Sequence, residues 1–296
     1  IFKDGSSVAT GTTSSTATFA GELRIGEGAA HGSMDGYLDE IRLSNTARYT
    51  SSFTPSTTEF IGDDNTMLLL HCDGADDGTS FPDTSTHTIT ANGDVTNTRA
   101  QSKVGDSSIK FDGTGDYLSV PHSTDFNFDT GDFTVEFWFR VAAFNSYTTF
   151  WSKSDADYTG IQSWVNSAGT IGFSADNDGS SSWVVSENSS SGLVSLNTWY
   201  HYALVRSGTS WNVYLDGTSI ISTTATLDFD DTSASLRFAN WSFAHDDLNG
   251  YMDEIRVSNV ERYSGNFTPQ TRGNPFTADA NTKLLIHSDY TGGLGA

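Results

Sequence analysis

The stretch FTVEFWFRV, Phe133 to Val141, decides the fold class, because its apolar residues alternate regularly with the residues between them. Side chains two apart on a strand share a face. One face would carry Phe133, Val135, Phe137, Phe139 and Val141, and the other Thr134, Glu136, Trp138 and Arg140. This period of two predicts a β-strand with one face in a hydrophobic core.

Further strands are expected on both sides of this stretch, separated by turns rich in Gly, Asp and Asn. Trp199 and Trp211 begin two strands joined by the turn Ser207–Ser210, and Asp216-Gly217 marks the next hairpin. Other expected strands are Met67–His71, Ser107–Gly113, Asp116–Pro121, Thr170–Ala175, Leu236–Asn240 and Met252–Ser258. Without a convincing helical period, the pattern predicts an all-β, antiparallel two-sheet sandwich.

The sequence repeats itself at long range. GYLDEIRLSNTARYTSSFTPST, from Gly36 to Thr57, matches GYMDEIRVSNVERYSGNFTPQT, from Gly250 to Thr271, at 14 of 22 positions with an offset of 214. IFKDGSSV at the start of the chain matches VYLDGTSI from Val213, and DDNTMLLLHCD from Asp63 matches DANTKLLIHSD from Asp279. A period of this length suits a whole domain rather than a short repeat.

The repeat predicts three units. Residues 1–62 are expected to be the C-terminal part of one domain, residues 63–272 a complete domain, and residues 273–296 a linker with the first strand of a further repeat. The first residue is Ile1 rather than Met, so we expect the chain to be a piece of a longer tandem array.

Composition excludes several classes of function. The 296 residues hold 15 Lys and Arg against 37 Asp and Glu, a formal net charge of −22, and no basic cluster occurs. Nucleic-acid phosphates and anionic membranes would be repelled, and no apolar run approaches a membrane span, so neither nucleic-acid binding nor membrane insertion is expected. One Cys excludes a disulfide framework and a Cys-based zinc site.

Several motifs in this order resemble a known family. They are LLLHCDG, KFDGTGDYLSVP, FDTGDFTVEFWFRV, NTWYHYALVRSG, WNVYLDG, NGYMDEIRVSN and RYSGNFTP. The pattern resembles the laminin-G-like, concanavalin A-like lectin/glucanase jelly-roll domains, in particular those of marine bacteriophage and bacterial surface proteins. The resemblance implies a jelly-roll fold, but its members include glycan binders, adhesion domains and glycoside hydrolases, so it does not choose a function.

Aromatic side chains are the expected sugar-binding groups, because the C–H face of a pyranose stacks on a ring. The candidates lie in or beside polar segments and are Trp151, Tyr158, Trp164, Trp183 and Trp241. Trp138 shares its predicted strand face with charged residues and is a further possibility. The alternative is that each Trp packs in the core of the sandwich.

Calcium is the expected cofactor, in a structural role. Loops rich in Asp, Asn and backbone carbonyls offer hard oxygen ligands, which suit Ca²⁺. The family resemblance implies Asp73, Asp112 and Asp253 as the metal ligands. Asp253 has the parity of core residues Ile255 and Val257, and a buried carboxylate needs a cation or several hydrogen-bond donors. The alternative is that Asp253 caps a turn.

No catalytic signature is evident, so we expect no enzymatic activity. A glycoside hydrolase needs two carboxylates that flank the scissile bond. The Glu-x-Asp-x-x-Glu strand of related hydrolases has no counterpart, because Trp138 follows two residues after Glu136 and Arg24 two residues after Glu22. No G-x-S-x-G turn for a serine nucleophile occurs either.

These observations favour a non-catalytic structural or adhesion protein, such as a phage fibre, whose tandem jelly rolls bind surface polysaccharides or other glycans. Weak sites in tandem gain strength through effective concentration. We expect an extracellular location on a virion surface, with a bacterial cell surface or secretion as alternatives. Self-association as a homo-oligomer, a trimer in phage fibres, or binding to other virion proteins is expected. A purely structural virion component and a polysaccharide-degrading glycoside hydrolase are the alternative functions.

Overall fold

The computed structural model describes most of the chain. The described residues are 2–3, 6–7, 22–25, 35–49, 51–58, 60–70, 77–83, 87–105, 107–154, 159–177, 183–229, 234–241, 247–271 and 278–286. Within these ranges no helix is long and apolar enough to cross a membrane. The regular secondary structure in these ranges consists of β-strands and one 3₁₀ helix, η1 (Thr124–Phe126).

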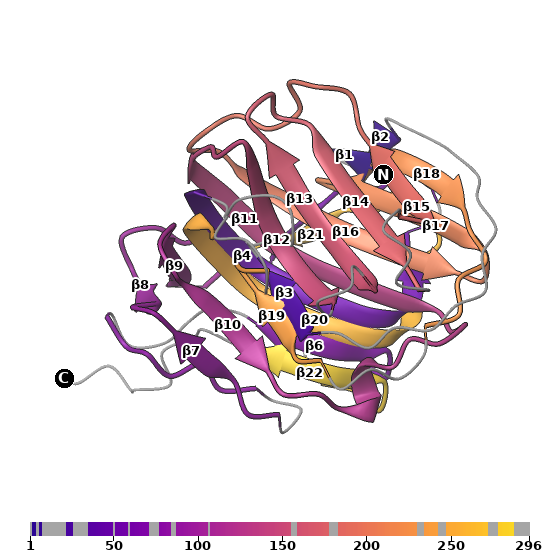
Figure 1. The fold of residues 1–296 in the computed structure, drawn as a ribbon, viewed down its shortest axis with the longest axis horizontal. Helices are drawn as coiled ribbons and strands as arrows, with labels where there is room; N and C mark the ends of the chain where they lie inside the picture. The colour runs from indigo at the N-terminus through magenta and orange to yellow at the C-terminus, as the bar shows by residue number, and fades with distance from the viewer. Residues whose placement is uncertain are drawn as a thin grey trace.

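The larger main sheet contains the central strand β11 and is drawn across the middle of Figure 1. Its order is β2-β1-β18-β17-β16-β11-β4-β6-β22-β20-β9-β8. The strands are β1 (Phe2–Lys3), β2 (Ser6–Ser7), β4 (Asp35–Arg48), β6 (Thr66–Leu70), β8 (Thr96–Thr98), β9 (Ser108–Asp112), β11 (Phe133–Ala143), β16 (Trp199–Ser207), β17 (Ser210–Leu215), β18 (Thr218–Thr224), β20 (Asn249–Tyr263) and β22 (Thr282–Ile286).

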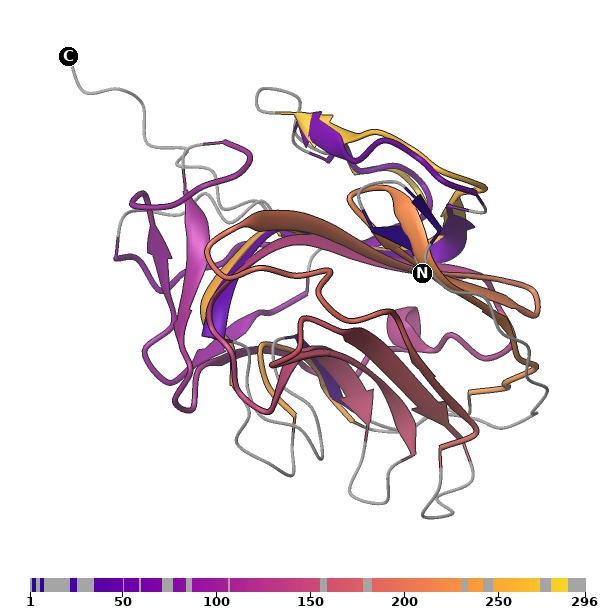
Figure 2. The same cartoon turned by 90° about the horizontal axis from the view of Figure 1, so that it is seen from above.

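The smaller main sheet packs against one face of the larger sheet, and a two-stranded sheet lies over the other face (Figure 2). The smaller main sheet has the order β15-β14-β13-β12-β19-β10-β7, with β3 also paired to β12. Its strands are β3 (Glu22–Ile25), β7 (Thr90–Asn92), β10 (Tyr117–Val120), β12 (Tyr147–Ser154), β13 (Gly160–Asn166), β14 (Ile171–Asp176), β15 (Val185–Asn188) and β19 (Leu236–Phe238). The two-stranded sheet pairs β5 (Ser56–Thr58) with β21 (Pro269–Thr271).

The hydrophobic core lies between the two main sheets, where the alternation in β11 predicts it. All five apolar residues of one β11 face, Phe133, Val135, Phe137, Phe139 and Val141, are buried in a single cluster. Phe137 stacks on Tyr202 of β16 at 4.8 Å between ring centroids, and Phe139 meets Phe150 of β12 at 4.5 Å. The predicted two-sheet, antiparallel, concanavalin A-like jelly-roll sandwich is thereby confirmed.

The predicted turns also occur where the sequence places them. Asp216 and Gly217 both have positive φ, 48° and 74°, as the two central residues of a type I′ hairpin require. The Asp216 carboxylate accepts a hydrogen bond of 2.6 Å from the His201 backbone N–H, which fixes the turn against β16. This hairpin joins β17 to β18.

The outer face of the large sheet is covered rather than open to solvent. Phe60, Leu69, Val104 and Leu285 pack with Trp138, the residue that lies between the core-facing Phe137 and Phe139 on β11. This cover buries Glu136, which is 0 % exposed. Both faces of β11 are therefore inside the protein, although the alternation predicts a single buried face.

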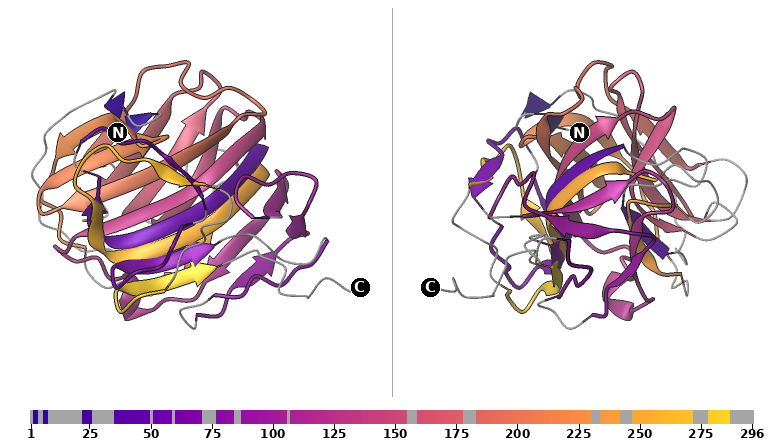
Figure 3. Two further views of the ribbon diagram at one scale, coloured as in Figure 1. Left: turned by 180° about the vertical axis from the view of Figure 1, so that it is seen from behind. Right: turned by 90° about the vertical axis from the view of Figure 1, so that its left-hand side faces the viewer.

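Two segments meet β11 at the same position. The first closing segment, residues 35–58, contains β4 and β5, and the second closing segment, residues 249–271, contains β20 and β21. Trp138 of β11 is opposite Asp39 in one pairing and Asp253 in the other, and the neighbouring residues follow the same equivalence. The two segments run side by side along β11 (Figure 3).

Candidate functional site

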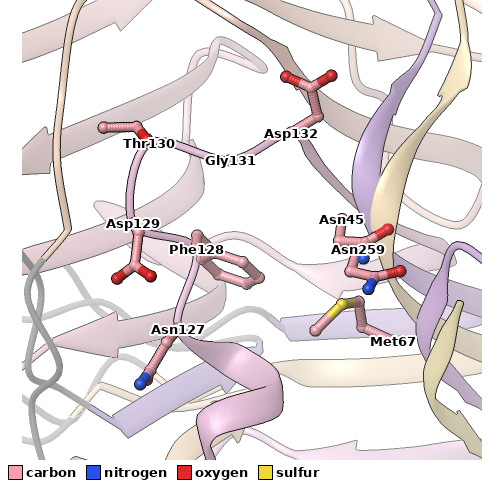
Figure 4. Close-up of a pocket in the computed structure, with 9 residues that line it drawn as sticks. All are labelled: Asn45, Met67, Asn127, Phe128, Asp129, Thr130, Gly131, Asp132 and Asn259. Carbon is pink, nitrogen blue, oxygen red and sulfur yellow. The ribbon is translucent and has the colours of Figure 1, made fainter.

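A polar pocket of about 350 Å³ lies where the loop before β11 faces the closing segments. Figure 4 shows the Phe128 ring extending from this loop toward Asn45, Asn259 and Met67. The lining residues are Asn45, Met67, Asn127, Phe128, Asp129, Thr130, Gly131, Asp132 and Asn259. The volume lies within the range of small-molecule sites, about 300 to 1,000 Å³.

A tight turn shapes the loop of residues 127–132. The Gly131 N–H donates a hydrogen bond of 2.7 Å to the Phe128 carbonyl. Asp129 has a positive φ of 39°, a conformation that Asp tolerates better than most residues. The Phe128 ring stacks on Phe133 at 4.2 Å, which ties the loop to the first residue of β11. The short segment NFDTGD thus combines an apolar anchor with two carboxylates on a turn.

The buried Arg206 of β16 holds this loop from beneath. Its guanidinium donates hydrogen bonds to three backbone carbonyls, those of Asp129 at 2.8 Å, Gly208 at 3.1 Å and Leu227. Its ring neighbours are Trp211 and Phe229, at 5.1 and 5.4 Å from the guanidinium carbon. Burial lowers the pKa of Arg206 to about 10, against the opposing effect of nearby Asp carboxylates. The loop that forms one wall of the pocket is therefore preorganised.

The opposite wall comes from the closing segments. Asn45 and Asn259 are equivalent residues of the two segments, each following a buried serine, Ser44 or Ser258. Carboxylates accept hydrogen bonds from hydroxyl groups, and amides both donate and accept. The pocket therefore suits an uncharged ligand that is rich in hydroxyl groups.

The predicted aromatic platform needs correction at three positions. Trp151, Trp164 and Trp241 are 0, 5 and 2 % exposed. Each belongs to a strand or adjoins one in the smaller main sheet, and the Trp241 indole N–H donates to the Ser154 hydroxyl at 2.5 Å. A ring without an exposed face cannot stack on a sugar that arrives from solvent, so these three are packing residues here.

Among the described residues, the aromatic candidates Trp183 and Trp138 do not line the pocket. Trp183 is half-buried just before β15, and Tyr158 lies outside the described residues. Trp138 is 2 % exposed, and the Lys103 ammonium lies 4.3 Å from its ring centroid. The aromatic residue that lines the pocket is Phe128, which was not among the residues predicted from the sequence. Most of its side chain is buried.

Two of the three predicted metal ligands, Asp112 and Asp253, lie among the described residues. Asp73 lies outside the described residues. Asp253 is fully buried, and its carboxylate accepts hydrogen bonds from the backbone N–H groups of Val104 at 3.1 Å and Lys103 at 3.4 Å. Two backbone donors thus take the place of the expected cation. Among the described residues, Asp253 is not part of the carboxylate group that contains Asp112, so these two predicted ligands are not brought together there.

Asp112 instead gathers with Asp94 and Asp116, whose nearest ligand atoms all lie within 4.8 Å of one another. Asp116 is 1 % exposed and accepts hydrogen bonds of 2.8 Å from the backbone N–H groups of Asp94 and Asp112. Burial raises the pKa of Asp116 to about 7, and the nearby Asp112 carboxylate adds to the rise. Three carboxylates in this arrangement fit a hard cation such as Ca²⁺. The sequence feature that could have indicated this carboxylate group is DGTGD, residues 112–116, in which Asp112 and Asp116 flank a glycine-containing turn.

A buried charged cluster is the second feature that the sequence reasoning missed. Glu136 lies 3.2 Å from Arg256 and 3.5 Å from the Nε2 atom of His201, and all three are buried. Desolvation raises the pKa of Glu136 well above its ordinary value and lowers that of His201. Glu136 is enclosed beneath Phe60 and Trp138, so it is a structural carboxylate here rather than a solvent-facing one.

The chain belongs to the concanavalin A-like lectin/glucanase superfamily, whose family model matches residues 112–264, just over half of the chain. This match includes the pocket loop, most strands of the smaller main sheet, and strands β11, β16, β17, β18 and β20 of the larger one. No curated protein matches the chain.

One solved structure is similar over part of the chain. It is domain 4 of AbnA, a GH43 extracellular arabinanase from Geobacillus stearothermophilus, in complex with arabinotriose. The identity is 18 %, the match covers 57 % of this chain and 80 % of that one, and the TM-score is 0.37.

Proposed function

We propose that the protein binds neutral carbohydrate, without catalysis, in the pocket between the 127–132 loop and the two closing segments. The observation that carries the proposal is that Asn127, Asp129 and Asp132 line one pocket together with two asparagines of the closing segments and the Phe128 ring. Sugar hydroxyls need such acceptors and donors, held in fixed positions. Membership of a lectin and glucanase superfamily supports the same class of ligand.

A neutral rather than an anionic glycan is favoured by charge. The chain has a formal net charge of −22, and the pocket itself contributes two carboxylates. A uronate or sulfated sugar would be repelled by the net charge of the chain at long range and by the two pocket carboxylates at short range. The proposed ligand is therefore a neutral polysaccharide segment of one or two sugar units within the pocket.

Calcium is proposed as a structural cofactor at the carboxylates of Asp94, Asp112 and Asp116. A bound divalent cation would offset most of the negative charge of three acids that lie close together, and would tie β9 to the loops on either side of it. This role is separate from sugar recognition, since none of the three residues lines the pocket.

The proposed setting is an extracellular adhesion protein, such as a phage fibre or another virion or cell-surface appendage. Its sequence repeats would place several weak sites on one chain, and binding to a repetitive surface glycan then becomes tight through effective concentration. Self-association or contacts with other virion proteins would multiply the sites further.

A glycan array of neutral and acidic bacterial and algal polysaccharides tests the proposal. Asp129→Asn and Asn127→Ala should each weaken binding of the retained neutral glycan by about tenfold or more, because each removes a hydrogen bond to the sugar. Asp77→Asn is the matched control, since Asp77 is exposed with a positive φ of 58° and lies outside the pocket.

Three results would contradict the proposal. Equal retention by the Asp129→Asn variant and the wild-type chain would exclude this pocket as the site. Failure to retain any glycan would favour a purely structural component. New reducing ends released from a retained polysaccharide would instead identify a glycoside hydrolase.

A further inference from the structure

We infer that the carboxylates of Asp132 and Glu261 form an acid-sensitive latch, which holds the 127–132 loop to β20 more firmly at mildly acidic pH than at neutral pH. Asp132 lies just before β11, and Glu261 lies near the end of β20. Glu261 is particular to the second closing segment, because Ala47 holds the equivalent position of the first. The inference does not depend on carbohydrate binding.

Both carboxylates of the latch are anchored at the turn between β16 and β17. The Asp132 carboxylate accepts a hydrogen bond of 2.6 Å from the Gly208 backbone N–H. The Glu261 carboxylate accepts one of 2.9 Å from the Ser207 hydroxyl. Because Ser207 and Gly208 are consecutive residues, this turn brings the two acids close together.

Strand pairing fixes the backbone on both sides of Glu261. The Thr134 hydroxyl donates a hydrogen bond of 3.2 Å to the Val260 carbonyl and accepts one of 3.5 Å from the Arg262 N–H. Thr134 follows Asp132 by two residues, so the chain that carries one acid is tied to the chain that carries the other. The two acids therefore cannot move apart while β11 and β20 stay paired.

The surroundings of Glu261 disfavour its charge. The residue is half-buried, and in the part of the chain that the structure describes its Oε1 atom has no hydrogen-bond partner. Burial raises the pKa of Glu261, the Ser207 hydroxyl opposes the rise, and the Asp132 carboxylate adds to it. Like charges at short range repel each other. The folded latch therefore favours a protonated Glu261.

The Asp132 side of the latch faces a cation. Burial lowers the pKa of Arg206 to about 10, and the carboxylates of Asp132, Asp228 and Asp129 oppose that fall. The Arg206 guanidinium thus attracts all three acids. Asp132 has a positive charge near it, so the proton of the latch is expected on Glu261.

The Glu261 side of the latch faces an uncharged group. Burial raises the pKa of Tyr214 on β17, and Glu261 adds to the rise, so this phenol stays protonated at neutral pH. The guanidinium groups of Arg262 on β20 and Arg48 on β4 form ion pairs with Asp63. Neither faces Glu261 as the Arg206 guanidinium faces Asp132.

The direction of the pH dependence follows from the raised pKa of Glu261. The folded chain binds this proton more tightly than the unfolded chain does. The resulting stabilisation is complete below the ordinary value of 4.5 and is lost as the pH rises through the higher folded value. Since Asp132 lines the pocket, the latch sets how firmly that wall is held.

Urea unfolding of the full chain at pH 5 and pH 8 tests the latch. Glu261→Gln keeps an oxygen acceptor for Ser207 but cannot ionise. The folding equilibrium constant of this variant, relative to the wild type, should be about fivefold larger at pH 8 than at pH 5. A ratio that is equal at the two pH values would overturn the inference.

Glu187→Gln is the matched control. Glu187 is a half-buried glutamate of the smaller sheet that also accepts a hydrogen bond from a hydroxyl, that of Thr223 at 3.2 Å. Its ratio to the wild type should be the same at pH 5 and pH 8. A ratio that changes as much as that of Glu261→Gln would show a general effect of glutamate charge and would count against the latch.

A second variant isolates the contribution of the partner acid. Asp132→Asn removes the charge but keeps an oxygen for the Gly208 N–H. In this background the effect of Glu261→Gln at pH 8 should fall by about twofold or more. Hydrogen exchange of the Gly208 amide, corrected for the intrinsic effect of pH, should show less protection at pH 8 than at pH 5 in the wild type only. An undiminished effect of Glu261→Gln in the Asp132→Asn chain would refute the coupling of the two acids.

Discussion

Replacement of the buried Arg206 should separate the value of its hydrogen bonds from the cost of burying its charge. Methionine keeps the apolar length of the side chain but removes every donor. Lysine keeps the charge but presents a compact ammonium in place of the planar fork that reaches the three carbonyls. We expect Arg206→Lys to destabilise the domain more than Arg206→Met.

The magnitude follows from the surroundings of the three carbonyls. Leu227 is fully buried, so loss of its donor leaves a desolvated acceptor at a cost of about 2 kcal/mol. Asp129 and Gly208 are exposed, and water can replace the guanidinium there at a cost of about 0.5 kcal/mol each. The fall in the pKa of Arg206 to about 10 indicates that burial of the cation costs about 3 kcal/mol, which methionine recovers and lysine does not.

Urea unfolding at pH 7, followed by tryptophan fluorescence, measures the effect. Arg206→Met should leave the free energy of unfolding within about 1 kcal/mol of the wild-type value, because the lost hydrogen bonds and the avoided charge burial nearly cancel. Arg206→Lys should lower it by about 3 kcal/mol, with the slope against urea unchanged. The Asp77→Asn chain serves as a control with an exposed change. A lysine variant as stable as the wild type, or more stable than the methionine variant, would refute the reasoning.

Three further predictions concern packing and the metal. Gly172→Ala should lower the free energy of unfolding by about 3 kcal/mol, since the new Cβ would lie 2.6 Å from Cη2 of the rigid Trp164 ring. An unchanged free energy of unfolding would show that Trp164 is not a tightly packed core residue. Trp241→Phe should cost about 1 kcal/mol by removing the donor to Ser154, and should leave glycan retention unchanged. Calcium at a hundred times its Kd should stabilise the domain by about 2.7 kcal/mol in calorimetry, and Asp112→Asn should abolish the response; equal responses would exclude the carboxylate cluster.

Periodicity predicted the strands well because a strand records its buried face directly in sequence. The alternation of β11 and the Asp216-Gly217 turn needed only neighbouring residues for their interpretation. The prediction of exposed aromatic residues was wrong for Trp151 and Trp164, because exposure depends on residues that are distant in the sequence. Trp151 and Trp164 occur beside polar residues in the sequence, yet their strands are covered on both sides, and polar neighbours such as Ser152 and Ser163 are buried as well. A local pattern does not reveal how many layers cover a sheet.

The candidate sites depended on residues that are distant in sequence. Asp112 was predicted as a ligand, but its neighbours in space, Asp94 and Asp116, were not selected, because pairing of β9 and β10 with other strands sets their positions. The pocket joins the 127–132 loop to asparagines from the closing segments. Sequence distance conceals such contacts until strand order is known.

The sequence alone determined the all-β class, the sandwich, the acidic surface charge and the similarity of the two closing segments, since each is written in composition, period or identity. The tertiary structure decided which side chains are exposed and which carboxylates converge. The physical reason is that burial and charge interactions depend on distance in space, and long-range strand pairing sets those distances.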